Sequence, residues 1–235
     1  MEAKNVALIL AAGKGERMKG AREKAFTLVL GKPLLAWTLG VFGSYPHIHE
    51  VIVVVPRHRE REVTEEILEP YALSGVRLVS GGIHRQDSMH NGFHTIAEPC
   101  NVVVIHDGAR PLVEKEIIGR VMDAAQIHGA SVAAVPLKDT VKVGDLRGMV
   151  RGTPDRNSLW AVQTPQGYQY SVIKEALAAA TKDRFYGTDD ASLVERIGKP
   201  VKIVTGSYEN LKVTTPEDVV VAEAILRERV KGGDI

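Results

Sequence analysis

The sequence predicts an α/β fold, Rossmann-like, with a mainly parallel sheet, helices on both faces and a projecting β-ribbon arm. Short aliphatic runs recur along its 235 residues, and segments with helical spacing separate most of them. One stretch of short β-type pieces interrupts this alternation. Alternating strands and helices favour a parallel sheet, because each strand is followed by a crossover that returns along a face of the sheet.

The first strand is expected at residues Val6 to Leu10, a continuous aliphatic run that ends in Ala11, Ala12 and Gly13. Such a run is typical of a strand that is buried on both faces. Further strands of this kind are expected at Val51 to Val55, Val76 to Val79, Val102 to Ile105, Val132 to Val135 and Val201 to Val204.

Helices are expected between these strands, at Leu34 to Phe42, Glu60 to Leu68, Gln86 to Ile96, Ile117 to Ile127 and Val172 to Ala180. The last helix has an explicit start signal, with Thr215 as the cap and Pro216 at the first helical position. Acidic residues follow in its first turn, where the helix dipole favours negative charge. We expect this helix to run to about Val230.

Residues 138–162 interrupt the alternation of strands and helices. Short β-type pieces are separated here by the turn segments 144–148 and 154–157. A β-ribbon that projects from an α/β core usually packs on another surface, and a partner subunit is one candidate. We expect one domain over residues 1–235, with 138–162 as its arm.

Composition excludes several classes of function. The 29 acidic and 30 basic residues nearly cancel, so no net field draws the chain to nucleic acid or to an anionic membrane. No aliphatic run approaches the roughly 20 residues of a membrane-spanning helix. The single cysteine, Cys100, cannot form an internal disulfide. These observations favour a cytoplasmic protein without a membrane or nucleic-acid partner.

The first strand leads directly into a glycine loop, Ala11-Ala12-Gly13-Lys14-Gly15, followed by Arg17 and Lys24. Ligands of parallel sheets bind beyond the carboxyl ends of the strands, and small residues let backbone N–H groups approach phosphate. A triphosphate is the expected ligand. A turn with solvated charges is the alternative.

Two familiar nucleotide motifs fail at this loop. A dinucleotide fingerprint needs a glycine where Met18 stands and an acid where the second strand ends, at Pro56 and Arg57. A Walker A motif needs Lys-Ser/Thr after its second glycine, where Ala21 and Arg22 stand. The loop therefore belongs to neither class.

A second motif, His106-Asp107-Gly108-Ala109-Arg110-Pro111, follows the strand that ends at Ile105. Asp107 is expected over the same crevice as the glycine loop. Because Mg²⁺ needs only one or two carboxylates when it is bound with phosphates, Asp107 is the candidate metal ligand. An aspartate that caps the following turn is the alternative.

A third motif, Gly81-Gly82 with Ser88, begins a helix after another strand. Its backbone groups and hydroxyl could recognise a base and ribose, although a diglycine helix entry is also common for conformational reasons. Lys212, between a strand and the last helix, could reach the same phosphates. The segments Gln163 to Gln166 and Thr188 to Ala191 could each be a connecting loop without a functional role.

Seven motifs follow one another along the chain: LILAAGKGERM with Lys24, GGIHRQDS, HDGARP, KDTVK, PDRNSLWAVQTPQ, TDDAS and LKVTTPED. Together, and in this order, they resemble the 2-C-methyl-D-erythritol 4-phosphate cytidylyltransferase family over essentially the whole chain. The resemblance implies that Ala11, Ala12, Gly13, Lys14 and Gly15 cradle the triphosphate of CTP. It implies that Arg17 and Lys24 stabilise charge at the α-phosphate and that Lys212 contacts phosphate. It also implies Mg²⁺ on Asp107.

The resemblance assigns the remaining residues to cytidine and to the acceptor. Gly82 and Ser88 would recognise cytosine and ribose. The residues expected to bind the acceptor are Asp107, Arg110, Thr140, Arg156, Thr164 and Thr188. Residues 138–162 would be a dimerisation arm that carries Thr140 and Arg156 into the partner's site.

The implied reaction joins CMP from CTP to methylerythritol 4-phosphate. A phosphate nucleophile is anionic near neutral pH, with a second pKa of about 6, so no general base is required. Three rivals remain: a cytidylyltransferase for another polyol phosphate such as ribitol 5-phosphate, a non-catalytic nucleotide-binding module, and an NAD-linked dehydrogenase. The failed dinucleotide fingerprint disfavours the last.

Overall fold

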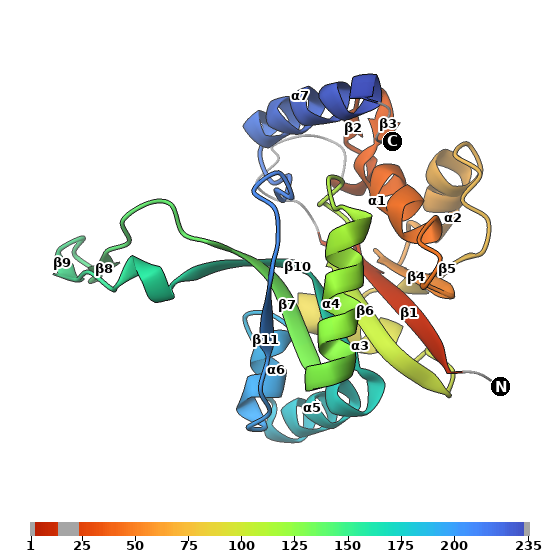
Figure 1. Cartoon of the computed structure of the whole chain (residues 1–235). Helices are drawn as coiled ribbons and strands as arrows, with labels where there is room; N and C mark the ends of the chain where they lie inside the picture. Colours follow the sequence, from red (N-terminus) through yellow and green to blue (C-terminus); the bar gives the residue numbers. More distant parts are fainter. Residues whose placement is uncertain (1–2, 14–23, 233–235) are drawn as a thin grey trace.

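The computed structural model describes residues 3–13 and 24–232, and of Lys24 the main chain only (Figure 1). The strands are β1 (Lys4–Leu10), β2 (Leu28–Val29), β3 (Lys32–Pro33), β4 (Glu50–Val55), β5 (Val76–Ser80), β6 (Cys100–Asp107), β7 (Ala130–Pro136), β8 (Val143–Gly144), β9 (Val150–Gly152), β10 (Trp160–Gln169) and β11 (Lys202–Thr205). The helices are α1 (Leu34–Gly43), α2 (Glu60–Val63), α3 (Arg85–Phe93), α4 (Lys115–His128), α5 (Tyr170–Asp183), α6 (Ala191–Arg196) and α7 (Pro216–Gly232).

A seven-stranded sheet in the order β11-β7-β10-β6-β1-β4-β5 forms the centre of the molecule. The neighbours β6-β1, β1-β4, β4-β5 and β11-β7 are parallel. Only β10 runs antiparallel, to both β6 and β7. The prediction of a mainly parallel, Rossmann-like sheet is confirmed.

Alternate residues of the central strands face opposite layers of helices. In β1, Leu8 packs in a core with Met89 of α3, whereas Ile9 packs with Leu39 of α1. Helices α3, α5 and α6 cover the first face, and α1 and α4 cover the second. Because helices cover both faces of the sheet, the sequence of β1 does not alternate between apolar and polar residues, as predicted.

The interpretation of Gln163 to Gln166 as a connecting loop is wrong. These residues lie in β10, which runs between β6 and β7, and all of them are buried. Its pairing with β7 shifts register between Val162 and Gln166. Such irregularities re-aim side chains next to functional sites. They also accommodate Pro165, which a regular central strand disfavours.

Other details differ from the sequence prediction. The edge strand β5 is only partly buried and β11 is mostly exposed, so neither is buried on both faces. The expected helix at 60–68 continues from α2 as a π-helical segment, Thr64–Leu68. Helix α6 and the hairpin β2-β3, which packs against α7, were not expected.

The segment between β7 and β10 leaves the body of the molecule as a ribbon that carries β8 and β9 (Figure 1). Its base is closed by a hydrogen bond of 3.2 Å from Leu137 N to Leu159 O. Tyr208 braces the base, because its hydroxyl donates to Pro136 O at 2.8 Å. Among the residues that the structure describes, no helix has the length and apolar character needed to cross a membrane.

Candidate active site

Three of the predicted loops meet at the carboxyl ends of β1, β5 and β6. A Cβ added to Gly81 would lie 2.4 Å from Ala12 Cβ, so the diglycine loop touches the end of the first strand. On the other side, a Cβ on Gly108 would lie 3.2 Å from Ala11 Cβ. The loop at Ala11 to Gly13 therefore lies between the two others. Predicted site residues Lys14, Gly15 and Arg17 lie outside the described residues, as does the side chain of Lys24.

The diglycine loop is held by the first turn of α3. Gly82 N donates to Ser88 Oγ at 3.1 Å, and Ser88 Oγ donates to His84 O at 3.2 Å. A Cβ on Gly82 would lie 2.3 Å from Asp87 Cβ, so only glycine fits this approach. Ser88 is 4% exposed. Its hydroxyl orders the loop, and recognition of cytidine by Gly82 and Ser88 stays a prediction.

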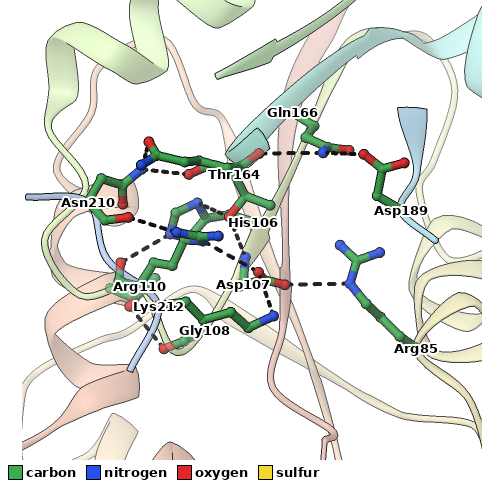
Figure 2. A network of polar contacts seen from close by, with 12 residues as sticks. Arg85, His106, Asp107, Gly108, Arg110, Thr164, Gln166, Asp189, Asn210 and Lys212 are labelled. Atoms are coloured by element: carbon green, nitrogen blue, oxygen red, sulfur yellow. Dashed lines mark hydrogen bonds and ion pairs between the residues drawn. The ribbon is translucent and has the colours of Figure 1, made fainter. Parts of the chain in front are cut away.

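Asp107, the last residue of β6, is surrounded by three cations. Its Oδ2 lies 2.9 Å from Lys212 Nζ and 3.5 Å from Arg110 Nε. Its Oδ1 lies 3.5 Å from Arg85 Nε, which approaches from the side opposite Arg110 (Figure 2). Burial alone raises the pKa of Asp107, but Lys212, Arg85 and Arg110 together hold the pKa well below its usual value. The carboxylate is therefore ionised at neutral pH.

The main chain of Asp107 is held by a buried hydrogen-bond network. Asp107 N donates to Thr164 Oγ1 at 3.0 Å, and Thr164 Oγ1 lies 3.0 Å from His106 Nδ1. Burial lowers the pKa of His106 to about 3, so the ring is neutral. Its Nε2 lies 3.2 Å from Arg110 O, which only accepts, so we assign the ring hydrogen to Nε2. Nδ1 then accepts the Thr164 hydroxyl hydrogen.

Arg110 and Asn210 connect the segments that form the site (Figure 2). Arg110 Nη1 donates to Asn210 O at 2.7 Å. Asn210 is fully buried, and its Nδ2 donates to Thr164 O at 2.8 Å. The segment before Lys212 is thus tied to β10 and to the loop after β6.

An open cleft of about 460 Å³ brings together five of the predicted site residues, and its lining includes Asp107, Arg110, Thr164, Thr188 and Lys212. Thr140 and Arg156 do not line it. Both are exposed on the ribbon, where Arg156 Nη1 donates to Lys138 O at 2.7 Å. Within one chain the structure therefore separates these two residues from the other acceptor-binding candidates.

Sequence reasoning missed several residues of this site. Arg85 and Asp190 lie inside the motifs GGIHRQDS and TDDAS but received no role, because the sequence does not show that Asp190 is buried beside Arg85. His106 and Asn210 are fully buried polar residues. Nothing in the sequence distinguishes them from surface residues, because their partners are distant along the chain.

Comparisons with known proteins agree with this geometry. The family model described as "IspD: 2-C-methyl-D-erythritol 4-phosphate cytidylyltransferase" matches residues 5–228. The protein of that name from Syntrophus aciditrophicus is 45% identical over 229 residues, which cover 97% of this chain and 98% of the relative. The one from Geobacter metallireducens is 45% identical over 228 residues, covering 95% and 98%.

Solved structures show the same fold. The 4-diphosphocytidyl-2C-methyl-D-erythritol synthase of Anaerococcus prevotii superimposes with a TM-score of 0.84 at 32% identity, covering 96% of each chain. The 2-C-methyl-D-erythritol 4-phosphate cytidylyltransferase of Thermus thermophilus gives a TM-score of 0.79 at 35% identity, covering 97% of this chain and 100% of the other. This chain therefore belongs to the 2-C-methyl-D-erythritol 4-phosphate cytidylyltransferase family of nucleotidyltransferase enzymes.

Proposed function

We propose that this enzyme transfers CMP from CTP to 2-C-methyl-D-erythritol 4-phosphate and releases pyrophosphate. The reaction is a step of the non-mevalonate isoprenoid pathway. The observation that carries the proposal is the cleft at Asp107, which lies beside the glycine loop and gathers the residues expected to bind the acceptor. Family membership supplies the identity of both substrates.

The chemistry needs alignment and charge neutralisation more than proton transfer. An acceptor phosphate oxygen attacks the α-phosphorus of CTP, the new P–O bond forms, and the bond to the leaving pyrophosphate breaks. The nucleophile is already anionic, so electrostatic repulsion from the negatively charged triphosphate opposes its approach. Lys212 lines the cleft and is 38% exposed, which supports its proposed contact with phosphate. Arg17 and Lys24 are the further cations of the proposal. Preorganised cations of this kind are the main source of catalysis in phosphoryl transfer.

A magnesium ion belongs to the proposal as the partner of the triphosphate. Among the described residues no group of three or more His, Cys, Asp or Glu side chains could hold a metal alone. Asp107 lines the cleft as an ionised carboxylate, so it is the proposed protein ligand of an ion that phosphate oxygens mostly hold. When bound, the ion would neutralise phosphate charge. Calorimetric titration of CTP with magnesium should show weaker binding to Asp107→Asn, and an unchanged magnesium dependence would contradict the role of Asp107 as a ligand.

The ribbon is proposed to pair with a second copy of the chain. Its exposed apolar side chains support this proposal: Leu146 is fully exposed, and Val143, Met149 and Val150 are each more than half exposed. Thr140 and Arg156 would then contribute to the partner's cleft, where Arg156 would bind the acceptor phosphate. A cytoplasmic location and the absence of membrane and nucleic-acid partners stay predictions.

Subunit complementation tests the exchange of arms. In a mixed dimer of Arg156→Ala and Asp107→Asn chains, one cleft carries both defects and the other carries neither. If chains mix freely, about a quarter of all clefts should be intact and activity should return on mixing. No return of activity, with mixed dimers verified by mass spectrometry, would contradict the role of Arg156 in the partner's cleft.

The assay that tests the activity is pyrophosphate release with each of the four nucleoside triphosphates, paired in turn with methylerythritol 4-phosphate and ribitol 5-phosphate. We expect turnover with CTP and methylerythritol phosphate. Preference for ribitol phosphate would support the rival polyol reaction. Nucleotide binding without turnover of any pair would support a non-catalytic nucleotide-binding module.

A further inference from the structure

One guanidinium joins three segments of the site. Arg85, the first residue of α3, donates from Nη1 to Asp190 Oδ1 and from Nη2 to Asp190 Oδ2, both at 2.8 Å. Its Nε lies 3.5 Å from Asp107 Oδ1 (Figure 2). Arg85 thereby connects the diglycine loop to the end of β6 and to the start of α6. The Asp190 side chain is only 2% exposed, so this two-pronged pair is largely removed from solvent.

Neighbouring contacts join the same two segments. Gln86 Nε2 donates to Phe185 O at 2.8 Å, and Gln86 Oε1 accepts from Gly187 N at 2.9 Å. Tyr186 Oη donates to Asp87 Oδ1 at 2.9 Å. The first turn of α3 and residues 185–190 are thus joined along a continuous line, which we call the α3 seam. Thr188, an acceptor-binding candidate, lies within this seam.

Several features indicate a role beyond holding two surface segments together. Arg85 lines the acceptor cleft itself, together with Asp107 and Thr188. Its charge acts on the carboxylate that Lys212 also contacts, so removing Arg85 changes the balance of charge around Lys212. Arginine provides a fixed fork and a third donor at Nε, so it can hold Asp190 and face Asp107 at once, whereas a lysine ammonium is a single point charge.

We propose that Arg85 is a positioning residue, which holds Asp107 and the Thr188 segment in a fixed position relative to the diglycine loop, so that acceptor and nucleotide align. The inference rests on the proposed transfer of CMP to a phosphorylated acceptor. It assigns no contact with substrate to Arg85. A loss of alignment of about 1 Å can lower the rate of a two-substrate reaction by roughly 100-fold.

The test compares Arg85→Gln and Arg85→Lys with the double variant Arg85→Gln/Asp190→Asn. Arg85→Gln alone leaves the buried Asp190 without its cation and should lower the unfolding temperature, because an unpaired buried charge is strongly destabilising. The double variant places two neutral amides there and should unfold at a temperature close to that of the wild type. Arg61→Gln is the matched control, because Arg61 pairs with Glu65 at 2.7 Å on an exposed surface away from the seam.

Steady-state kinetics with CTP and acceptor then separate structure from positioning. We expect kcat/KM for the acceptor to fall roughly 10- to 100-fold in all three Arg85 variants, including the double variant with restored stability. The Kd of CTP measured without acceptor should change less than about 3-fold, an expectation that follows from the same positioning argument. Arg61→Gln should match the wild type.

Two results overturn the inference while leaving the proposed function intact. One is a double variant that regains both stability and kcat/KM, because Arg85 would then serve folding only. The other is an Arg85→Lys variant with wild-type kcat/KM, because its ammonium cannot reproduce the fork. A wild-type enzyme without turnover on these substrates would instead overturn the proposed function, and this inference with it.

Discussion

Replacing Thr164 by valine distinguishes two roles for its hydroxyl. The resemblance to the family makes Thr164 an acceptor ligand, whereas in the structure the hydroxyl accepts from Asp107 N and contacts His106 Nδ1, each at 3.0 Å. Thr164 is 4% exposed. Valine has nearly the same shape, so Thr164→Val removes these two hydrogen bonds without opening a cavity.

The magnitude follows from the groups that lose their partners. Asp107 N and His106 Nδ1 would both stay buried without a hydrogen-bond partner, and each such group costs about 1–3 kcal/mol. We therefore expect Thr164→Val to lower the free energy of unfolding by about 2–6 kcal/mol. Asp107 should also lose its position, and kcat/KM for the acceptor should fall.

Urea unfolding followed by circular dichroism measures the first effect, and the pyrophosphate assay measures the second. Thr164→Ser is the matched control, because it keeps the hydroxyl and removes only a methyl group. If Thr164→Val unfolds within about 0.5 kcal/mol of the wild type and only the KM for the acceptor rises, the structural role is refuted. The hydroxyl would then serve the acceptor directly.

Three further predictions concern separate parts of the molecule. Gly82→Ala should raise the KM for CTP at least about 10-fold, because the new Cβ lies 2.3 Å from Asp87 Cβ and displaces the loop. Gly43→Ala, where the added Cβ meets nothing within 4 Å, should leave it unchanged, and equal effects of both variants would contradict the account. Lys24→Ala should lower kcat on the order of 100-fold, the effect of losing one preorganised contact to the transition state, whereas a normal kcat would remove Lys24 from the mechanism. Burial, with Glu50 and Glu98 nearby, raises the pKa of the Cys100 thiol to about 12, so the thiolate form is present only at high pH. Iodoacetamide should therefore alkylate the native protein at pH 8 on the order of 1,000-fold more slowly than the urea-unfolded chain, and comparable rates would contradict this environment.

The sheet was predictable where local pattern and tertiary environment agree. The run Val6 to Leu10 is covered by helices on both faces, so its uninterrupted aliphatic pattern predicts the strand correctly. The part of β10 beyond Val162 was missed for the opposite reason. Polar residues and Pro165 favour a loop locally, and only the neighbours β6 and β7, together with the register shift, make a buried strand of that segment.

The site was predictable only in part. Motifs at strand ends indicated Asp107 and the glycine loop, because the carboxyl ends of parallel strands share one edge of the sheet. The pairing of Arg85 with Asp190 joins residues 105 positions apart. The bond from Arg110 to Asn210 joins residues 100 positions apart. No local spacing indicates such partners, so these roles required the three-dimensional structure.

The convergence of the three loops on one nucleotide is the central claim, and a crystal structure with CTP and magnesium tests it most directly. We predict that the triphosphate lies against the main chain of Ala11 to Gly13 and within reach of Lys24, with cytosine at the Gly81-Gly82 loop and the α-phosphate facing the Asp107 cleft. A nucleotide bound elsewhere on the molecule, or a cytosine remote from the diglycine loop, would contradict the account.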